Sequence, residues 1–450
     1  MNRTRSPEVR TPALPPETLA RWVRDARQRT LALADGLAPQ QLIGPYRKTV
    51  NPILWALGHV AFFQERWAWC HLRNAPPLHP DMELLYDSFE VEHPLRWKLA
   101  LPDIGATQGY LANVMEHVLQ HLQQGNGASP EDVSYFHQLA VFHEDMHAEA
   151  ITYDRDTLEY PAPGSHPAPN ADAALDAAAL RAGPLPGDVE IPGSEAYLLG
   201  ALPGTPFVFD NEKWAHPVRV APFHIARAPV TNAEFAAFVE AGGYTTERFW
   251  SPAGWRWRAE EQLTHPTRWR RATGGGWQVR SYDVWAPMAE HRPVDHVSWH
   301  EAMAWCAWAG RRLPTEAEWE LAASTAPGQG PADPKRSHPW GDADPIPGHA
   351  NLDARIGQTV DVAAFPAGDS AWGCRQMTGN VWEWTADAFY PYPGFIVDPY
   401  REYSAPWFGY HKVLRGGCWA TRGRLLRNTW RNFFMPHRTD ILSGFRTCAP

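Results

Sequence analysis

Apolar residues recur every three or four positions through most of the first 160 residues, which is the spacing of helices with one buried face. Asparagine or serine followed by proline opens two of these segments, and glycine closes two others, as is usual at helix ends. Four segments of this length predict an up-and-down four-helix bundle. The segments are 16–36, 51–73, 107–125 and 129–158, with Asn51 and Ser129 as the expected N-caps.

The pattern changes after residue 160. Residues 161–190 are rich in proline and alanine, which is typical of an interdomain linker. From residue 191, short β-like apolar runs alternate with glycine, proline and tryptophan, and two segments, 231–243 and 298–324, have helical spacing. We therefore expect a disordered leader (1–15), a helical bundle (16–160), a linker (161–190) and an irregular, loop-rich α+β domain (191–450).

Composition narrows the functional classes. The chain has 450 residues, more than one ordinary core holds, and a net charge of −9 without any lysine or arginine run, which argues against a nucleic-acid partner. No apolar run approaches the roughly 18 residues of a membrane span, and the N-terminus lacks the apolar stretch of a secretory signal. The five cysteines lack CxxC spacing. We expect free thiols, a cytoplasmic location, no membrane partner and a monomer or weak oligomer.

The stretch "FHEDMHAEA" (142–150) carries the most informative pair of residues. His143 and His147 are four positions apart, so they lie about 40° apart on one helix face. Their neighbours on that face, such as Leu139 and Ile151, are apolar, which predicts that both imidazoles point into the bundle. Buried imidazoles without partners cost a few kcal/mol, roughly. A shared metal ion would give both a partner.

A third ligand has to come from another helix. His59 lies on an apolar stripe of the second segment, together with Trp55 and Phe63. A lone histidine on such a face is usually a core residue with a hydrogen-bond partner, but beside His143 and His147 it is the best candidate for a third ligand. Three neutral imidazoles suit zinc, iron, nickel or copper, and their geometry does not choose among these metals.

A second histidine pair in the same chain serves as a comparison. His117 and His121 are also four positions apart, but their face of the helix carries Asn113, Gln120 and Gln124. A polar face predicts that this pair is exposed to water. We therefore expect no metal site there.

The spacing of His59 from the two later histidines resembles that of the ergothioneine-type sulfoxide synthase family. In that family a DinB-like bundle carries one histidine and then an HxxxHxE motif, here His143, His147 and Glu149. The C-terminal half resembles the formylglycine-generating-enzyme fold, which has a C-type-lectin-like architecture. Its motifs are "RRLPTEAEWELAA" (311–323), "GNVWEWTAD" (379–387), "VLRGGCWAT" (413–421) and "SGFRTC" (443–448).

This resemblance implies a mononuclear non-haem Fe(II) enzyme with His59, His143 and His147 as the metal ligands. Such an enzyme uses O₂ as a co-substrate to join a chalcogen to the imidazole of hercynine, the trimethylated betaine of histidine. Three imidazoles would leave coordination positions for O₂ and substrates. The 23 tryptophans are explained most simply as core residues, but aromatic faces also hold quaternary ammonium groups well.

Two tyrosines in "VDPYREYSAPWF" match a pair of tyrosines three positions apart in the family. The resemblance implies that Tyr400 is the catalytic residue that donates a proton or hydrogen atom, and that Tyr403 contributes to substrate binding. A phenol near the metal can donate in this way, whereas phenylalanine cannot. The alternative is that both are loop tyrosines that pack against the linker.

Departures from the family bear on the chalcogen donor. Met146 stands where well-known members have a hercynine-contacting glutamine. Of two donor-binding arginines three positions apart, only Arg96 is present, and His93 occupies the other position. Phe433 and Phe434 replace a Trp-Asp pair whose aspartate contacts the donor's amino group. The loss of charged groups favours a neutral donor, so the sequence is most similar to the selenoneine synthase branch, in which a selenosugar gives selenoneine through a selenoxide.

Other functions remain as alternatives. An ergothioneine-type enzyme would use cysteine or γ-glutamyl-cysteine as a thiol donor. A cysteine oxidase like the formylglycine-generating enzyme needs a close cysteine pair near the C-terminus, but Cys418 and Cys448 are far apart in sequence. A DinB-like thiol transferase with zinc or nickel would not need the second domain. A lectin-like binding module would not need a buried histidine triad.

Overall fold

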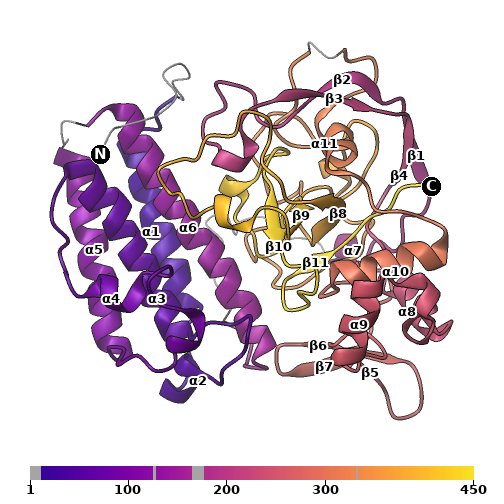
Figure 1. Cartoon of the computed structure of the whole chain (residues 1–450), viewed down its shortest axis with the longest axis horizontal. Coiled ribbons are helices and arrows are strands. Elements are labelled where there is room, and N and C mark those ends of the chain that lie inside the picture. Colours follow the sequence, from indigo (N-terminus) through magenta and orange to yellow (C-terminus); the bar gives the residue numbers. More distant parts are fainter. Residues whose placement is uncertain (1–11, 125–127, 165–176, 331–332) are drawn as a thin grey trace. The chain divides into compact units, whose positions relative to one another are not determined.

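The computed structural model describes residues 12–124, 128–164, 177–330 and 333–450 (Figure 1). The chain divides into two compact units, of which the first contains residues 1–166 with 204–207 and 281–284, and the second contains the rest. The first unit is helical and the second combines helices with small sheets, so the predicted fold class is confirmed. Most of the expected leader and part of the expected linker lie outside the described residues.

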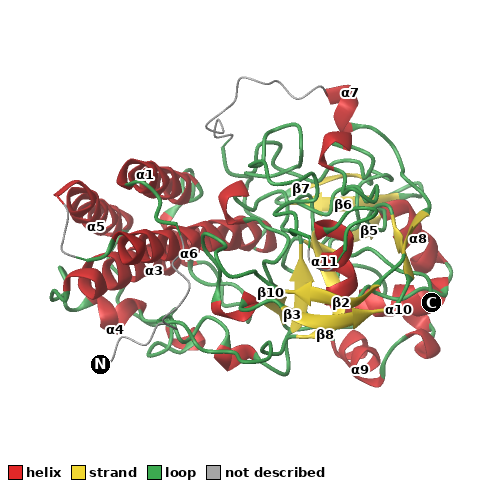
Figure 2. Ribbon diagram, turned by 90° about the horizontal axis from the view of Figure 1, so that it is seen from above, coloured by secondary structure: helices red, strands yellow, loops and turns green. Residues whose placement is uncertain are grey.

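Long helices make up the first unit. Helices α1 and α3 each pack against α5 and α6, and the core between them is apolar, with Leu57, Leu111 and Ile151 fully buried. Figure 2 shows these helices lying side by side. The long helices are α1 (Pro16–Ala32), α3 (Ile53–Gln64), α5 (Ile104–Gln124) and α6 (Pro130–Thr157). Shorter elements are α2 (Pro39–Ile43), α4 (Met82–Tyr86), the 3₁₀ turn η2 (His93–Leu95) and the π-helical continuation of α3, η1 (Glu65–His71).

The expected caps are partly correct. Ser129 caps α6, because its side chain accepts a hydrogen bond from the Asp132 backbone N–H, and Pro130 is the first helical residue. The prediction for Asn51 is wrong. Helix α3 has no side-chain cap, and the Asn51 Oδ1 atom instead accepts a hydrogen bond from Arg96 Nη1 at 2.7 Å. The competing partner is an arginine 45 residues away in sequence, which local spacing does not reveal.

One buried arginine connects the four long helices. Arg27 on α1 donates from Nε to Glu144 Oε1 on α6 at 2.8 Å, and from Nη2 to Gln64 Oε1 on α3 at 3.0 Å. Its Nη1 atom donates to the Leu111 carbonyl on α5 at 2.5 Å. Removing one partner of such a buried pair costs about 3–5 kcal/mol, because the other charge is left uncompensated. Glu144 directly follows His143 in the chain, so this contact also fixes the part of α6 that carries the histidines.

The second unit contains a central sheet with strand order β10-β9-β8-β11, whose strands are labelled in Figure 1. Strands β10, β9 and β8 are antiparallel, and β11 is parallel to β8. These strands are β8 (Trp382–Ala388), β9 (Lys412–Arg415), β10 (Asn432–Phe434) and β11 (Ser443–Gly444). The smaller sheets pair β1 (Asp188–Ile191) with β4 (Phe223–Ala226), β2 (Ser194–Leu199) with β3 (His216–Val220), and β6 (Trp277–Ser281) with β5 (Trp269–Arg271) and β7 (Val284–Pro287).

The helical segment expected at 298–324 is two helices, α10 (Trp299–Ala309) and α11 (Glu316–Ser324). Gly310 ends α10 with a left-handed conformation, φ 64°, which glycine adopts without steric cost. Pro314 disfavours helical geometry in the residue before it, and Thr315 then caps α11. The other α-helices of the unit are α7 (Ala177–Leu180), α8 (Asn232–Glu240) and α9 (Pro252–Glu260). Helix α7 and the first three residues of β1 lie inside the segment expected to be a linker.

Buried ion pairs give the C-terminal motifs a structural role. Arg415 of "VLRGGCWAT" pairs with Glu316 at 2.8 Å and with Glu320 at 2.5 Å, both from the "RRLPTEAEWELAA" motif. Arg431 also pairs with Glu316, and Lys335 with Glu320. All of these side chains are shielded from water, so each charge has to be matched by an opposite one. The motifs therefore hold α11 against the central sheet.

Acid should weaken this network in a defined pH range. Burial alone raises the pKa of Glu320, but Lys335 and Arg415 outweigh burial and lower that pKa to about 2. An unfolded glutamate titrates near 4.3, so the carboxylate stabilises the folded state above that pH, and this contribution is lost as pH falls toward 2. We expect E320Q to lower the free energy of unfolding by about 3 kcal/mol at pH 7.

The difference between E320Q and the unmodified chain should shrink between about pH 4.5 and pH 2. Urea unfolding at several pH values, followed by tryptophan fluorescence, measures it. E318Q is the matched control, since Glu318 pairs with Arg312, whose side chain is 37% exposed. Its effect should be smaller, because water screens exposed pairs. A pH-independent difference for E320Q would contradict the assignment.

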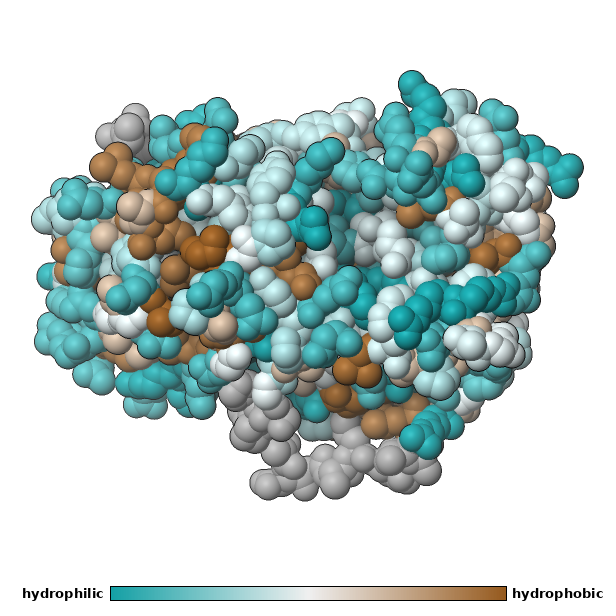
Figure 3. Space-filling view, turned by 90° about the horizontal axis from the view of Figure 1, so that it is seen from below, coloured by the Kyte–Doolittle hydropathy of each residue, from teal (hydrophilic) through white to brown (hydrophobic). Residues whose placement is uncertain are grey.

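The face drawn in Figure 3 mixes polar and apolar side chains. In the first unit, the exposed large apolar side chains lie between the end of α2 and the end of η2, and they are Tyr46, Leu84, Phe89 and Leu95. Among the described residues, none of the helices is both long and apolar enough to cross a membrane. The cytoplasmic location and the oligomeric state stay predictions.

Candidate metal centre

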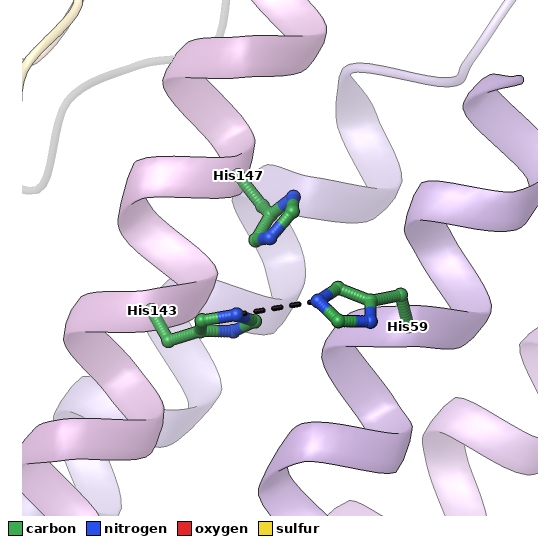
Figure 4. A group of neighbouring side chains, drawn as sticks. All are labelled: His59, His143 and His147. Carbon is green, nitrogen blue, oxygen red and sulfur yellow. Dashed lines mark hydrogen bonds between the residues drawn. The ribbon is translucent and has the colours of Figure 1, made fainter. Parts of the chain in front are cut away.

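The three histidines singled out in the sequence lie together in the first unit (Figure 4). His59 comes from α3, and His143 and His147 come from successive turns of α6. One ring nitrogen of each lies within 4.8 Å of the others. The Nε2 atoms of His59 and His143 are 3.3 Å apart, and two imidazoles bound to one ion at about 2.1 Å have their nitrogens about 3.0–3.4 Å apart.

Burial keeps these imidazoles neutral. His59 and His143 are almost completely buried, and His147 is half-buried. Burial lowers the pKa of His59 to about 4, although a hydrogen bond to the Tyr86 carbonyl opposes the shift. Burial also lowers the pKa of His143 and His147 well below the usual value. At neutral pH all three rings are therefore in the unprotonated form that binds a metal.

A backbone carbonyl selects the tautomer of His59. The Nδ1 atom lies 2.7 Å from the carbonyl oxygen of Tyr86, which only accepts hydrogen bonds, so Nδ1 carries the proton. The Nε2 lone pair then faces the other two histidines. Gly58 permits this arrangement, because a Cβ atom there would lie 2.1 Å from the Tyr86 ring. A partner that orients a ligating histidine in this way is a regular feature of protein metal sites.

Aromatic rings on α3 support two of the histidines. The Trp55 ring stacks on His59 with centroids 4.8 Å apart, and the Phe63 ring stacks on His143 at 3.6 Å. Trp55, His59 and Phe63 are four residues apart, so they form one stripe along the helix. Sequence reasoning named both aromatic residues only as part of an apolar face. The signal in the sequence for this supporting role was their position, four residues before and four residues after His59.

The donor set fits Fe(II) and equally other divalent transition metals. Imidazole nitrogen suits iron, zinc, copper and nickel, and three ligands leave the rest of an ion's coordination sphere for other molecules. The described residues contain no other group of histidine, cysteine or acidic side chains with this geometry. Met146 lies half-buried on α6, one residue before His147. Its predicted substrate contact stays a prediction.

The prediction for the comparison pair is wrong in part. His121 is buried, with 4% of its surface exposed, and its ring lies 6.1 Å from Trp69. His117 is half-buried and lies against the same tryptophan. Trp69 belongs to the π-helical segment η1, whose wider turn changes the direction of the side chains that follow it.

Tyr400 and Tyr403 lie in the second unit, in a loop fixed at both ends. Lys213 Nζ contacts both carboxylate oxygens of Asp398 at 2.7 Å, before the first tyrosine. After the second, Ser404 Oγ donates to Asp210 Oδ1 at 2.5 Å and accepts from Asn211 Nδ2 at 3.0 Å. The tyrosine rings are 6.0 Å apart. Burial raises the pKa of Tyr403, so its phenol keeps its proton at neutral pH.

Phe433 and Phe434 occupy neighbouring positions on β10 and have different surroundings. The Phe433 ring stacks on Phe389 with centroids 4.0 Å apart and lies 5.9 Å from Tyr403. The guanidinium of Arg438 lies 5.0 Å from the Phe434 ring. Side chains of adjacent strand residues point to opposite faces. The structure therefore brings Phe433, but not Phe434, into one aromatic cluster with Tyr403.

Comparison with known families gives each half of the chain a counterpart. Residues 23–151 match the DinB superfamily, and residues 176–449 match the sulfatase-modifying factor enzyme 1-like domain. The C-terminal half alone is similar to the formylglycine-generating enzyme of Streptomyces coelicolor, at 35% identity over 58% of this chain and 88% of that enzyme. The fold and the histidine triad thus define a two-domain protein with a DinB-type bundle and a formylglycine-generating-enzyme-type domain.

Relatives that match along almost the whole chain identify the family more specifically. The hercynine oxygenase of Mycolicibacterium thermoresistibile is 38% identical over 95% of this chain and 94% of its own length. The hercynine oxygenase of Mycobacterium tuberculosis is 38% identical over 96% of this chain and 98% of its own. The chain belongs to the hercynine oxygenase family.

Proposed function

We propose that this protein is a non-haem iron oxygenase that joins hercynine to a chalcogen donor, and that the donor is a selenosugar. The convergence of His59, His143 and His147 is the observation that carries the proposal. Three neutral imidazoles on two fixed helices match the need of an O₂-using iron site for open coordination positions. Membership of the hercynine oxygenase family supports hercynine as the acceptor and O₂ as the co-substrate.

The residues of the chain hold and orient the reactants. His59, His143 and His147 would bind Fe(II), which when bound supplies redox chemistry with O₂ that side chains alone lack. Trp55 and Phe63 restrict the rotation of two ligand rings and exclude water from their faces. Tyr400 would hold the proton or hydrogen atom that is delivered during coupling. The proposal for Tyr400 rests on the sequence of its loop.

The overall reaction balances with one molecule of O₂. A C–H bond of the hercynine imidazole and the Se–H bond of the donor break, and a C–Se bond forms. Selenium takes one oxygen atom to give a selenoxide, and the second oxygen leaves as water with the two hydrogens. The four electrons that O₂ accepts come from these two oxidations. A thiol donor would give the sulfoxide in the same way.

Contacts around the expected donor positions support a neutral donor. His93 Nε2 lies 2.8 Å from the Val50 carbonyl, so this nitrogen is already hydrogen-bonded to backbone. Arg96 is only 9% exposed and is surrounded by protein acceptors. Phe433 and Phe434 carry no charge. A zwitterionic donor such as γ-glutamyl-cysteine needs charged partners, whereas a sugar needs hydrogen bonds and apolar contacts.

A competition between donors tests the function. Protein loaded with Fe(II) without oxygen would receive hercynine and equal amounts of a selenosugar, cysteine and γ-glutamyl-cysteine, followed by O₂. We expect mass spectrometry to find a hercynine–selenium product in at least tenfold excess over sulfur products. A dominant sulfoxide would assign the ergothioneine-type reaction instead. Coupling with none of these donors would contradict the proposed function as a whole.

A further inference from the structure

Arg96 is part of the support of the histidine triad. Its guanidinium carbon lies 3.9 Å from the centre of the Trp55 ring, and the same tryptophan stacks on His59 at 4.8 Å with an angle of 13° between the ring planes. Trp55 is thus in contact with both Arg96 and His59. We propose that Arg96 is a positioning residue that fixes the His59 ring for metal binding, and not a ligand of the chalcogen donor.

The hydrogen bonds of Arg96 support this role. Its Nη1 atom donates to Asn51 Oδ1 at 2.7 Å, just before α3 begins. Its Nη2 atom donates to the Ser88 carbonyl at 3.2 Å and to the Val91 carbonyl at 3.3 Å, and Nε also donates to Val91. All three nitrogens therefore bind protein acceptors. A guanidinium that binds a donor carboxylate needs two free N–H groups side by side.

Hydrogen bonds to the end of α4 also hold the rings of Trp55 and His59. The Trp55 indole N–H donates to the Leu85 carbonyl at 2.7 Å, and His59 Nδ1 donates to the next carbonyl, that of Tyr86, also at 2.7 Å. Two adjacent backbone carbonyls at the end of α4 thus set the in-plane direction of both rings. Arg96 adds a further restraint, because its guanidinium lies over the Trp55 ring and limits the movement of that ring against His59. A cation above an indole is the favourable arrangement for such a contact.

This assignment rests on the proposed metal role of the triad. It predicts other effects on metal binding and on the KM of the donor than a donor-binding arginine would have. A positioning residue acts on the metal site when no substrate is present. A donor ligand acts on the KM of the donor and leaves metal binding unchanged. Support residues of this kind typically contribute about 10–100-fold to metal affinity. The test therefore measures metal binding alone, followed by the donor KM at saturating metal.

The experiment uses Co(II) as a probe in the absence of oxygen, with the full-length chain and the variants R96M and R96K. R96M keeps a long apolar side chain but loses the charge and the hydrogen bonds, and R96K keeps the charge but loses the flat group. We expect both variants to bind Co(II) about tenfold more weakly, with altered visible absorption bands of the bound ion. N51A should show the same change to a smaller degree, because it removes only one hydrogen bond of Arg96. The donor KM should change less than threefold in all of them.

R73M is the matched control. Arg73 lies 4.2 Å above the Trp69 ring in the same unit, and Trp69 contacts His117 and His121 instead of the triad. R73M should bind Co(II) like the unmodified chain. If R96M kept the normal Co(II) affinity and spectrum while the donor KM rose tenfold or more, Arg96 would be a donor ligand and the inference would be overturned. If the unmodified chain failed to bind Co(II), the proposed function itself would fail.

Discussion

Replacement of His143 by alanine is expected to remove both the bound metal and the turnover of hercynine. His143 is almost fully buried, and its Nε2 atom faces that of His59 at 3.3 Å. The two histidines that remain would offer one fewer nitrogen, and the cavity left by the ring does not supply another ligand. We expect Fe(II) affinity to fall by at least about a hundredfold, because losing a ligand exceeds the effect of losing a support residue.

Metal analysis after anaerobic loading with Fe(II) and gel filtration measures this loss, and product formation from hercynine, donor and O₂ measures turnover. H121A is the matched control, since His121 is equally buried in the same unit but lies outside the triad. It should retain the metal if it folds, which circular dichroism would check. A binding module without chemistry would keep its ligand affinity in the H143A variant, so that result would exclude the enzyme assignment.

The histidine triad was predictable because its geometry follows from helical spacing. Residues four apart share a face, and an apolar face points into the bundle, so His143 and His147 had to point inward together. His59 was the remaining histidine on an apolar face of a second helix. These arguments use only the spacing of residues within each helical segment, and that spacing is enough to place side chains on α3 and α6. The metal-binding role of the three residues stays a prediction.

The support around the triad was not predictable in the same way. The carbonyls of Leu85 and Tyr86 are backbone groups, and any residue type there would supply them. Besides the spacing of Trp55 and Phe63, Gly58 was a visible signal, because glycine inside a helix usually permits a close approach. Arg96 and Asn51 meet across 45 residues. The family resemblance implied that Arg96 binds the donor, and the helix-start signal predicted Asn51 as a cap. Contacts of this kind depend on how loops fold back, which periodicity does not encode.

The division at Gly310 shows a different kind of error. Both Gly310 and Pro314 are recognised signals for the end of a helix, and the expected helix at 298–324 ran through them. Apolar spacing on both sides of the break outweighed the signals in the prediction.

The depth of burial was also missed for His121, because a helical wheel shows which residues share a face but not which neighbour covers that face. Trp69, from the π-helical segment η1, provides the cover.

Replacement of Tyr400 by phenylalanine is expected to slow carbon–chalcogen coupling while the metal stays bound. The variant removes only the phenol oxygen and its proton, and the ligand histidines belong to α3 and α6, far away in the sequence. Loss of a positioned proton donor typically lowers a rate by about 10²–10⁴-fold. Single-turnover product formation after addition of O₂ should show this loss, and Co(II) affinity should remain unchanged.

Y403F is the control that separates a chemical role from loop packing. Tyr403 lies in the same loop, its ring stacks on Phe209 at 4.2 Å, and its hydroxyl lies 3.4 Å from the Trp430 indole nitrogen. Removing that hydroxyl should therefore change stability or substrate affinity and leave the coupling rate within about tenfold of normal. If Y400F coupled at the normal rate, Tyr400 would have no part in the chemistry, and the proton would have to come from another group or from water. If Y403F alone were slow, the two tyrosines would exchange the roles proposed for them, since both belong to the loop anchored by Asp398 and Ser404.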